Sequence, residues 1–184
     1  MAGLRAGAMG LPFLPARGIL GSSYMQIRQD FKVIENPYNG DEKIVLVPAI
    51  TPSASIFHAF QSDRDGNVLA DPPQESKLLA QATTGPVIAT VEEVVDELTP
   101  DINSTFIPGH LVTAVIHAPG GAHPTSCRGF YRTDAVHVQE YLASAKCPDQ
   151  WTRYLDRYVY QPRDYSQYLQ AVGRVKGEAD NLGT

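Results

Sequence analysis

Two short polar stretches, each directly after an apolar run, have the residue types that could take part in chemistry. The first, APGGAHP at residues 118–124, follows the β-branched run LVTAVI. Paired glycines let backbone N–H groups approach an anion or an oxyanion, and a neighbouring histidine can exchange a proton. The alternative is a glycine-supported turn whose histidine bonds a nearby carbonyl. The candidate substrate-binding residues of this stretch are Gly120, Gly121, Ala122 and His123.

The second polar stretch is DRDGN, at residues 63–67, after the run SIFHAFQS. Aspartate and asparagine side chains bond nearby backbone groups, and glycine permits positive φ, so the stretch predicts a tight turn. Local chemistry does not decide whether the turn also belongs to a site. Its candidate site residues are Asp65, Gly66 and Asn67.

Other motifs exclude several kinds of site. His117, His123 and Cys127 do not have the spacing of a helical or knuckle-type metal site, so we expect no metal. Cys127 and Cys147 lie far apart without a CxxC motif, which favours a reducing cytoplasm over a disulfide framework. The sequence has no GxSxG, GxGxxG or Walker motif, so it gives no support for a serine hydrolase, a dinucleotide enzyme or a P-loop NTPase.

Length and composition favour a single ordinary domain. The chain has 184 residues, 43% of them hydrophobic, and a net charge of −5 without a long basic run, so nucleic acid is not an expected partner. The segment before Asp30 contains arginines and no acidic residue, as a transit peptide does, but glycines and prolines interrupt it. No stretch approaches the roughly 20 apolar residues of a membrane span, so no membrane association is expected.

The pattern of apolar residues predicts an α/β fold with an open sheet and helical crossovers. Residues 31–37 and 43–50 flank a turn signal and predict a hairpin. Aromatic residues near the C-terminus recur at helical spacing, which is typical of a helix-packing surface rather than a cofactor site. The other expected elements are helices at 2–9, 76–82, 135–145, 150–160 and 165–174, and strands at 54–60, 86–95 and 110–119.

Three motifs in this order resemble a known family. They are GLPFLPARGILGSS, the segment from FKVIENPYNGDEK to QSDRDGNV, and VTAVIHAPGGAHPTSCRGFY. Together they look like the alpha subunit of class I CoA-transferases, of the glutaconate CoA-transferase branch, and the resemblance covers roughly residues 3–172. It extends to CoA-transferase-like acyl-CoA hydrolases that open the last steroid rings in bacteria.

The resemblance implies the open, mainly parallel sheet of the sugar-phosphate isomerase-like superfamily and a heteromer with a beta subunit. It implies that CoA moves between an acyl-CoA and a carboxylic acid, with the CoA thioester as substrate and no resident cofactor. The nucleophile is a glutamate of the beta subunit, so no catalytic residue is expected in this chain. Glu35 and Asn36 echo the beta-subunit Glu-Asn-Gly motif, but Pro37 replaces its glycine, and we reject Glu35 as nucleophile.

One departure from the family pattern concerns the N-terminus. Alpha subunits normally begin with a strand and a glycine-rich loop, whereas Met1 here falls inside an expected helix. We therefore expect a partial alpha-subunit-like domain at residues 1–175, lacking the N-terminal strands, and a disordered tail at 176–184. Three interpretations stay open: a transferase component, a ring-opening hydrolase component, and a noncatalytic fragment. The product of a neighbouring reading frame would distinguish them, because only a transferase partner carries Glu-Asn-Gly.

Overall fold

The computed structural model describes residues 1–72 and 75–173 and divides the chain into two compact units, Met1–His117 and Ala118–Thr184. The tail expected at 176–184 lies outside the described residues. None of the described helices is long and apolar enough to cross a bilayer.

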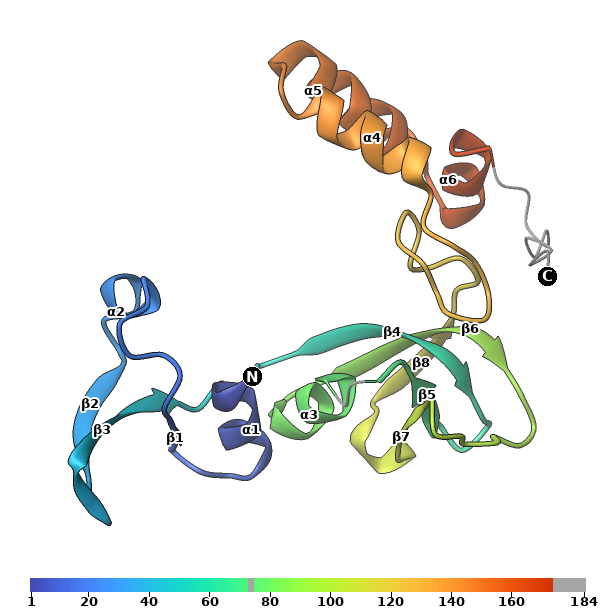
Figure 1. Cartoon of the computed structure of the whole chain (residues 1–184). Helices are drawn as coiled ribbons and strands as arrows, with labels where there is room; N and C mark the ends of the chain where they lie inside the picture. The colour runs from blue at the N-terminus through green and yellow to red at the C-terminus, as the bar shows by residue number, and fades with distance from the viewer. Residues whose placement is uncertain (73–74, 174–184) are drawn as a thin grey trace. The chain divides into compact units, whose positions relative to one another are not determined.

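The first unit contains a five-stranded sheet, a three-stranded sheet and short helices (Figure 1). Its helices are α1 (Ala2–Ala8), α2 (Tyr24–Ile27), α3 (Glu75–Ala82) and the 3₁₀ turn η1 (Gly109–Leu111). Its strands are β1 (Phe13–Ala16), β2 (Lys32–Asn36), β3 (Asn39–Pro48), β4 (Ser55–Ser62), β5 (Val68–Ala70), β6 (Val87–Val94), β7 (Thr105–Ile107) and β8 (Ala114–His117).

The larger sheet has the strand order β7-β5-β4-β6-β8. Strand β6 runs parallel to both β4 and β8, whereas β5 is antiparallel to both β4 and β7. The sheet is therefore open and belongs to an α/β fold, as expected. Its strand pairs are both parallel and antiparallel, whereas we expected a mainly parallel sheet. The reason is the short turn at residues 63–67, since a connection of this length joins antiparallel strands only.

One face of this sheet carries the core of the first unit. Small and β-branched side chains of four strands pack there with Ala80 of α3. Parallel strands carry such apolar side chains on a face that a helix covers. The alternate positions of β4 and β6 point to the other face, because side chains of a strand alternate. The fully buried or nearly buried core residues are Ala59, Val68, Ala70, Ala80, Val87, Ala89, Val91 and Ile107.

The three-stranded antiparallel sheet has the order β1-β3-β2 and contains the predicted hairpin (Figure 1). Val33 pairs with Val45 and Ile34 with Ile44, and a bulge follows Glu35 at the end of β2. Strand β1 was not expected from the sequence, because Pro15 lies within its four residues. Its position at the edge of the sheet explains how the proline is tolerated.

The second unit consists of a loop and a group of helices. The predicted helices are confirmed as α4 (Ala135–Ser144), α5 (Pro148–Leu155), continued by the π-helical turn η2 (Asp156–Tyr160), and α6 (Tyr165–Ala171). Helices α4 and α6 begin at aspartate N-caps whose side chains accept backbone N–H groups. The aromatic stripe packs against a neighbouring helix as expected: the ring of Tyr141 of α4 lies edge-on to those of Trp151 and Tyr154 of α5.

Candidate functional site

The predicted tight turn at residues 63–67 is confirmed at the carboxyl end of β4. Asp63 Oδ1 accepts the backbone N–H groups of Asp65 at 3.0 Å and Asn67 at 2.9 Å. Gly66 adopts a φ of +79°, a conformation that L side chains rarely adopt. The side-chain bonds to the backbone and the positive φ that the sequence predicts for this turn are therefore both present.

Asn67 also ties this turn to a distant segment. Its Nδ2 donates to Asp63 Oδ2 at 2.8 Å, and its Oδ1 accepts the backbone N–H of Gly109 at 2.8 Å. A Cβ at position 109 would lie 2.4 Å from the carbonyl oxygen of Asp65, so glycine is needed for this approach. The Asn67 side chain thus positions the turn, while the carboxylate of Asp65 is exposed. Substrate binding by Asp65, Gly66 and Asn67 stays a prediction.

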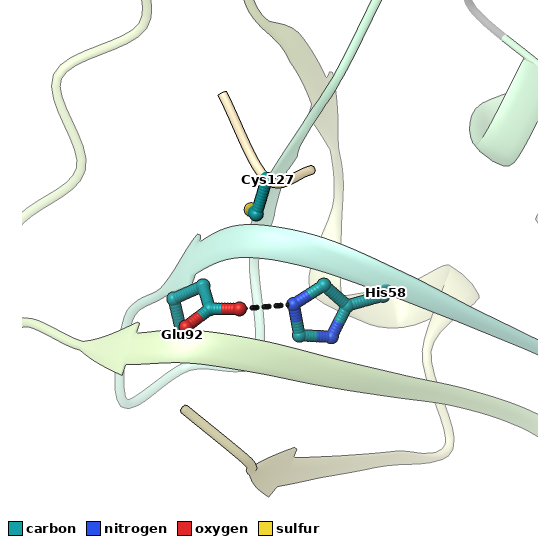
Figure 2. A group of neighbouring side chains, drawn as sticks. All are labelled: His58, Glu92 and Cys127. Carbon is teal, nitrogen blue, oxygen red and sulfur yellow. Dashed lines mark hydrogen bonds and ion pairs between the residues drawn. The ribbon is translucent and has the colours of Figure 1, made fainter. Parts of the chain in front are cut away.

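A buried glutamate and a partly buried histidine link two neighbouring strands of the larger sheet. His58 of β4 contacts Glu92 of β6 through Nε2 and Oε1 at 2.5 Å, as Figure 2 shows. His58 Nδ1 lies 2.8 Å from the hydroxyl of Thr90, and the Glu92 side chain is only 4% exposed. Both ring nitrogens of His58 are engaged, so the pair fits a link between strands better than a free acid–base group. Cys127, also labelled in Figure 2, belongs to the second unit.

Neither His58 nor Glu92 was predicted from the sequence as a site residue. The available signal was a polar residue within each of two otherwise apolar parallel strands, since such residues need a partner when buried. His117, which the sequence analysis weighed as a metal ligand, bonds the main-chain oxygen of Glu92 through Nε2 at 3.1 Å. It thereby joins β8 to β6 at the same edge of the sheet.

The glycine-rich stretch at residues 118–124 forms a folded loop of the second unit. Gly120 has a φ of +81°, and a Cβ there would lie 2.9 Å from Tyr165 Oη. That hydroxyl donates to the carbonyl of Pro119 at 2.7 Å, which holds the loop against α6. The strict need for glycine at position 120 therefore comes from backbone conformation and from this close approach.

The backbone N–H groups of this loop are used within the second unit. The N–H of Gly121 donates to Ala118 O at 2.9 Å, that of Ala122 to Tyr131 Oη at 2.9 Å, and that of His123 to Gly120 O at 3.0 Å. Each of these three donors has an acceptor within the unit, and binding of a substrate by this loop stays a prediction. The structure favours the alternative of a glycine-supported turn for the loop backbone.

His123 is the centre of a buried polar network. Its side chain is 0% exposed, with Nε2 3.2 Å from Asp134 Oδ2 and Nδ1 2.7 Å from Tyr168 Oη. A carboxylate only accepts, so Nε2 carries a hydrogen and donates to Asp134, while Nδ1 lies within hydrogen-bond distance of the Tyr168 hydroxyl. The backbone N–H of His137, and then the His123 side chain, lower the pKa of Asp134. His123 thus fastens the loop to α4 and α6.

A second histidine extends this network into the aromatic helices. The His137 ring packs edge-on against His123, with 5.0 Å between centroids, and its Nε2 lies 2.8 Å from Tyr154 Oη. Tyr158 donates to both carboxylate oxygens of Glu140, at 3.0 and 3.2 Å. Burial raises the pKa of Tyr154 and of Tyr158, and the bond to Glu140 raises that of Tyr158 further. Neither Asp134 nor His137 was predicted as a site residue, although an aspartate directly before a helical pattern is an N-cap signal.

The predicted site residues therefore fall into two sets. The structure brings together Gly120, Gly121, Ala122 and His123 in the second unit, and Asp65, Gly66 and Asn67 in the first. Glu35, rejected as nucleophile, lies on the exposed strand β2 opposite Lys43. A substrate role for either set stays a prediction.

Comparison with known proteins agrees with the fold. The family model for coenzyme A transferase matches residues 1–118. The chain is 34% identical over 175 residues to the A-type subunit of 3-oxoadipate CoA-transferase from Pseudomonas knackmussii, covering 93% of this chain and 60% of that protein. It is 31% identical to the cholesterol ring-cleaving hydrolase IpdA subunit of Rhodococcus jostii, covering 96% of this chain and 62% of that protein.

The crystal structure of glutaconate coenzyme A-transferase from Acidaminococcus fermentans superposes with a TM-score of 0.80 at 32% identity. The superposition covers 92% of this chain and 59% of that chain, so this chain spans about three fifths of the length of the relatives it matches. The expected α/β fold of these enzymes is thereby confirmed. The match of the family model over well over half of the residues shows that this chain belongs to the coenzyme A transferase family.

Proposed function

We propose that the chain is an alpha-type component of a heteromeric CoA-transferase that moves CoA between an acyl-CoA and a carboxylic acid. The observation that carries the proposal is the similarity of more than nine tenths of the chain to the A-type subunit of a 3-oxoadipate CoA-transferase. The structural likeness to glutaconate coenzyme A-transferase supports the same assignment. CoA enters as the thioester substrate, so no resident cofactor is proposed.

The nucleophile is proposed to come from a beta-type partner. A glutamate that attacks an acyl-CoA releases CoA thiolate and forms an acyl-glutamyl anhydride, which the thiolate then converts to a glutamyl thioester and a free acid. Neither Glu92 nor Glu35 suits this role, because Glu92 is buried against His58 and Glu35 lies on an exposed hairpin strand. We therefore propose no catalytic residue in this chain.

The contribution of this chain is proposed to be the shape of the substrate cleft. The turn at residues 63–67 lies at the carboxyl end of β4, the edge at which ligands of open α/β sheets commonly bind. The loop at residues 118–124 belongs to the second unit, and we propose a separate substrate contact for it. The proposed substrate-binding residues are Asp65, Gly66, Asn67, Gly120, Gly121, Ala122 and His123.

A reducing compartment suits this assignment. Within the described residues, neither Cys127 nor Cys147 forms a disulfide, and we propose that the protein works in the cytoplasm. Neither nucleic acid nor a membrane is part of the proposal, since the net charge is −5.

A second candidate function is supported by the 31% identity to the cholesterol ring-cleaving hydrolase subunit. In a component of such a hydrolase, water attacks a cyclic acyl-CoA and no covalent glutamyl intermediate forms. A partner that carries Glu-Asn-Gly favours the transferase, and a partner without that glutamate favours the hydrolase. A noncatalytic role remains the interpretation for a chain without any such partner.

The deciding experiment is coexpression of the chain with a beta-type subunit, followed by an assay with glutaryl-CoA and acetate. We expect acetyl-CoA to form only when both chains are present, and mass spectrometry to find CoA on a glutamate of the partner. Release of free CoA without any need for acetate would instead support the hydrolase. Turnover by this chain alone, abolished by Glu35→Ala, would overturn the assignment of the nucleophile.

A further inference from the structure

A cavity of about 290 Å³ lies in the second unit, against α4, α5 and η2. Its size is near the lower end of small-molecule sites. Its lining includes no residue of the turn or the loop to which the transferase function is assigned. The lining residues are Glu140, Ala143, Ser144, Gln150, Arg153, Tyr154 and Arg157.

The cavity carries an excess of positive charge. Arg153 and Arg157 both line it, four residues apart along a continuous helical segment. Within the described ranges, the guanidinium of Arg153 has no ion pair or hydrogen bond, and that of Arg157 lies 3.9 Å from Glu140 Oε1. Both oxygens of Glu140 accept from Tyr158, so this carboxylate only partly balances the two cations.

Two cations four residues apart repel each other and destabilise a helix, so an anion between them would offset a cost that is present without it. Each guanidinium offers five N–H donors in a planar fork that suits oxyanions. A doubly charged phosphate group has enough oxygens to accept from both arginines at once, whereas a single carboxylate satisfies only one fork. The amide of Gln150 adds a further donor on the same wall.

We propose that this cavity binds a small ligand with a phosphate-monoester dianion, held between Arg153 and Arg157. The ring of Tyr154 forms an apolar wall for the part of the ligand that carries the phosphate. Glu140 limits the affinity by repulsion. The site does not depend on the proposed transferase function.

The protein contains a natural reporter for this site. Trp151 is the only tryptophan, and its ring stacks on Tyr154 with 5.7 Å between centroids and 5° between planes. Inorganic phosphate, titrated into the full chain at pH 7.5 and constant ionic strength, is expected to change the Trp151 fluorescence in a saturable way. Glutarate, titrated in parallel, is expected to bind more weakly than phosphate.

Four variants test the geometry. Arg153→Gln and Arg157→Gln are each expected to weaken phosphate binding about tenfold, since each removes charge-assisted hydrogen bonds. Arg163→Gln, the same change at an exposed arginine outside the cavity, is expected to leave the affinity within about twofold. Glu140→Gln is expected to strengthen binding about threefold, because it removes a negative charge and keeps an acceptor for Tyr158.

Circular dichroism establishes that each variant is folded, and Arg153→Lys replaces Arg153→Gln if the latter is not. A fluorescence change that does not saturate, an equal loss in Arg163→Gln, or no gain in Glu140→Gln would overturn the proposal. Tighter binding of glutarate than of phosphate would show that the cavity prefers carboxylates, and would overturn the phosphate assignment.

Discussion

Asn67 and Gly109 are 42 residues apart in the chain, and the side-chain oxygen of the first accepts the backbone N–H of the second at 2.8 Å. This bond joins the β4–β5 turn to the start of η1 and places the turn at the edge of the sheet. Replacing Asn67 by Ala removes the bond and also the donor to Asp63. We expect a loss of about 1–3 kcal/mol in the free energy of unfolding, measured in urea, because an internal donor and acceptor lose their partners.

Asp65→Ala is the matched control, because its exposed side chain lies in the same turn. Its effect is expected to stay within about 0.5 kcal/mol. An equal effect of the two substitutions would mean that the Asn67–Gly109 bond does not stabilise the fold.

Two glycines of the second unit allow the cost of a strained backbone conformation to be measured separately from the cost of a steric contact. Gly120 and Gly129 both have positive φ, but only at Gly120 would a Cβ meet another group, Tyr165 Oη at 2.9 Å. Gly129→Ala is expected to cost about 1–2 kcal/mol from backbone strain alone. Gly120→Ala should cost more and should displace Tyr165, as seen in thermal unfolding and in the tyrosine signals of an NMR spectrum. An equal loss of stability in both variants would show that the contact with Tyr165 does not add to the cost of substituting Gly120.

Gly121→Val tests the loop in the assembled enzyme. A branched side chain at this exposed position is expected to abolish transferase activity of the complex with its partner by blocking access to the loop. Assembly is checked by size-exclusion chromatography. A variant complex that assembles and turns over like the parent would make the loop a surface turn only.

The lowered pKa of Asp134 predicts a pH dependence of stability. A carboxyl whose folded pKa lies below its unfolded value stabilises the fold above the unfolded pKa of about 3.9, and this contribution is lost as pH falls through the folded pKa. Asp134→Asn keeps an N-cap side chain but does not titrate, so its stability relative to the parent should improve as pH falls below about 4. Urea unfolding between about pH 2 and pH 6, a window spanning the reference pKa of Asp, measures this difference.

The difference between Asp134→Asn and the parent at about pH 6, well above the reference pKa of Asp, is the internal control for this experiment. Parallel curves for Asp134→Asn and the parent would show that His137 and His123 do not depress the pKa of this carboxyl.

The buried His58–Glu92 pair is expected to contribute strongly to the sheet. His58→Ala removes the imidazole from a carboxylate that is 4% exposed, and such a loss commonly costs about 3–5 kcal/mol. Gln61→Ala removes the exposed Gln61–Glu93 bond between the same two strands and should cost less than about 1 kcal/mol. Urea unfolding compares them. Similar losses would show that the buried pair is no more important than a surface contact.

Exposed apolar side chains on the sheet predict association. Ile56 is 65% exposed and Ile116 48% exposed, and their register with Ile88 and Thr90 places them on the face opposite to the core. Parallel strands are normally covered on both faces, so we expect oligomers of the chain alone at micromolar concentration and a discrete heteromer with a beta-type partner. Sedimentation velocity measures both. A chain that stays monomeric and does not bind the partner would contradict the proposed assembly.

The local elements of the fold follow from the residue pattern alone. Apolar, β-rich runs on either side of the turn signal at residues 38–42 predicted the β2–β3 hairpin, although the turn itself lies at residues 37–38. Helical spacing of apolar and aromatic residues predicted α4, α5 and α6. The aspartates, glycine and asparagine of residues 63–67 were sufficient for the turn, since its hydrogen bonds involve residues four positions apart or fewer. The three-residue strands β5 and β7 were missed, because so short a segment has no recognisable period.

The contacts of the candidate residues, by contrast, depend on tertiary packing. His58 and Glu92 are 34 residues apart, and the parallel pairing of β4 and β6 brings them into contact. The contact could not be predicted, because apolar strand patterns do not encode register. The GGAH stretch had a composition compatible with either an anion site or a turn. The acceptors of its N–H groups and the partners of His123 come from within the loop and from α4 and α6, and local sequence does not specify contacts between segments that folding alone brings together.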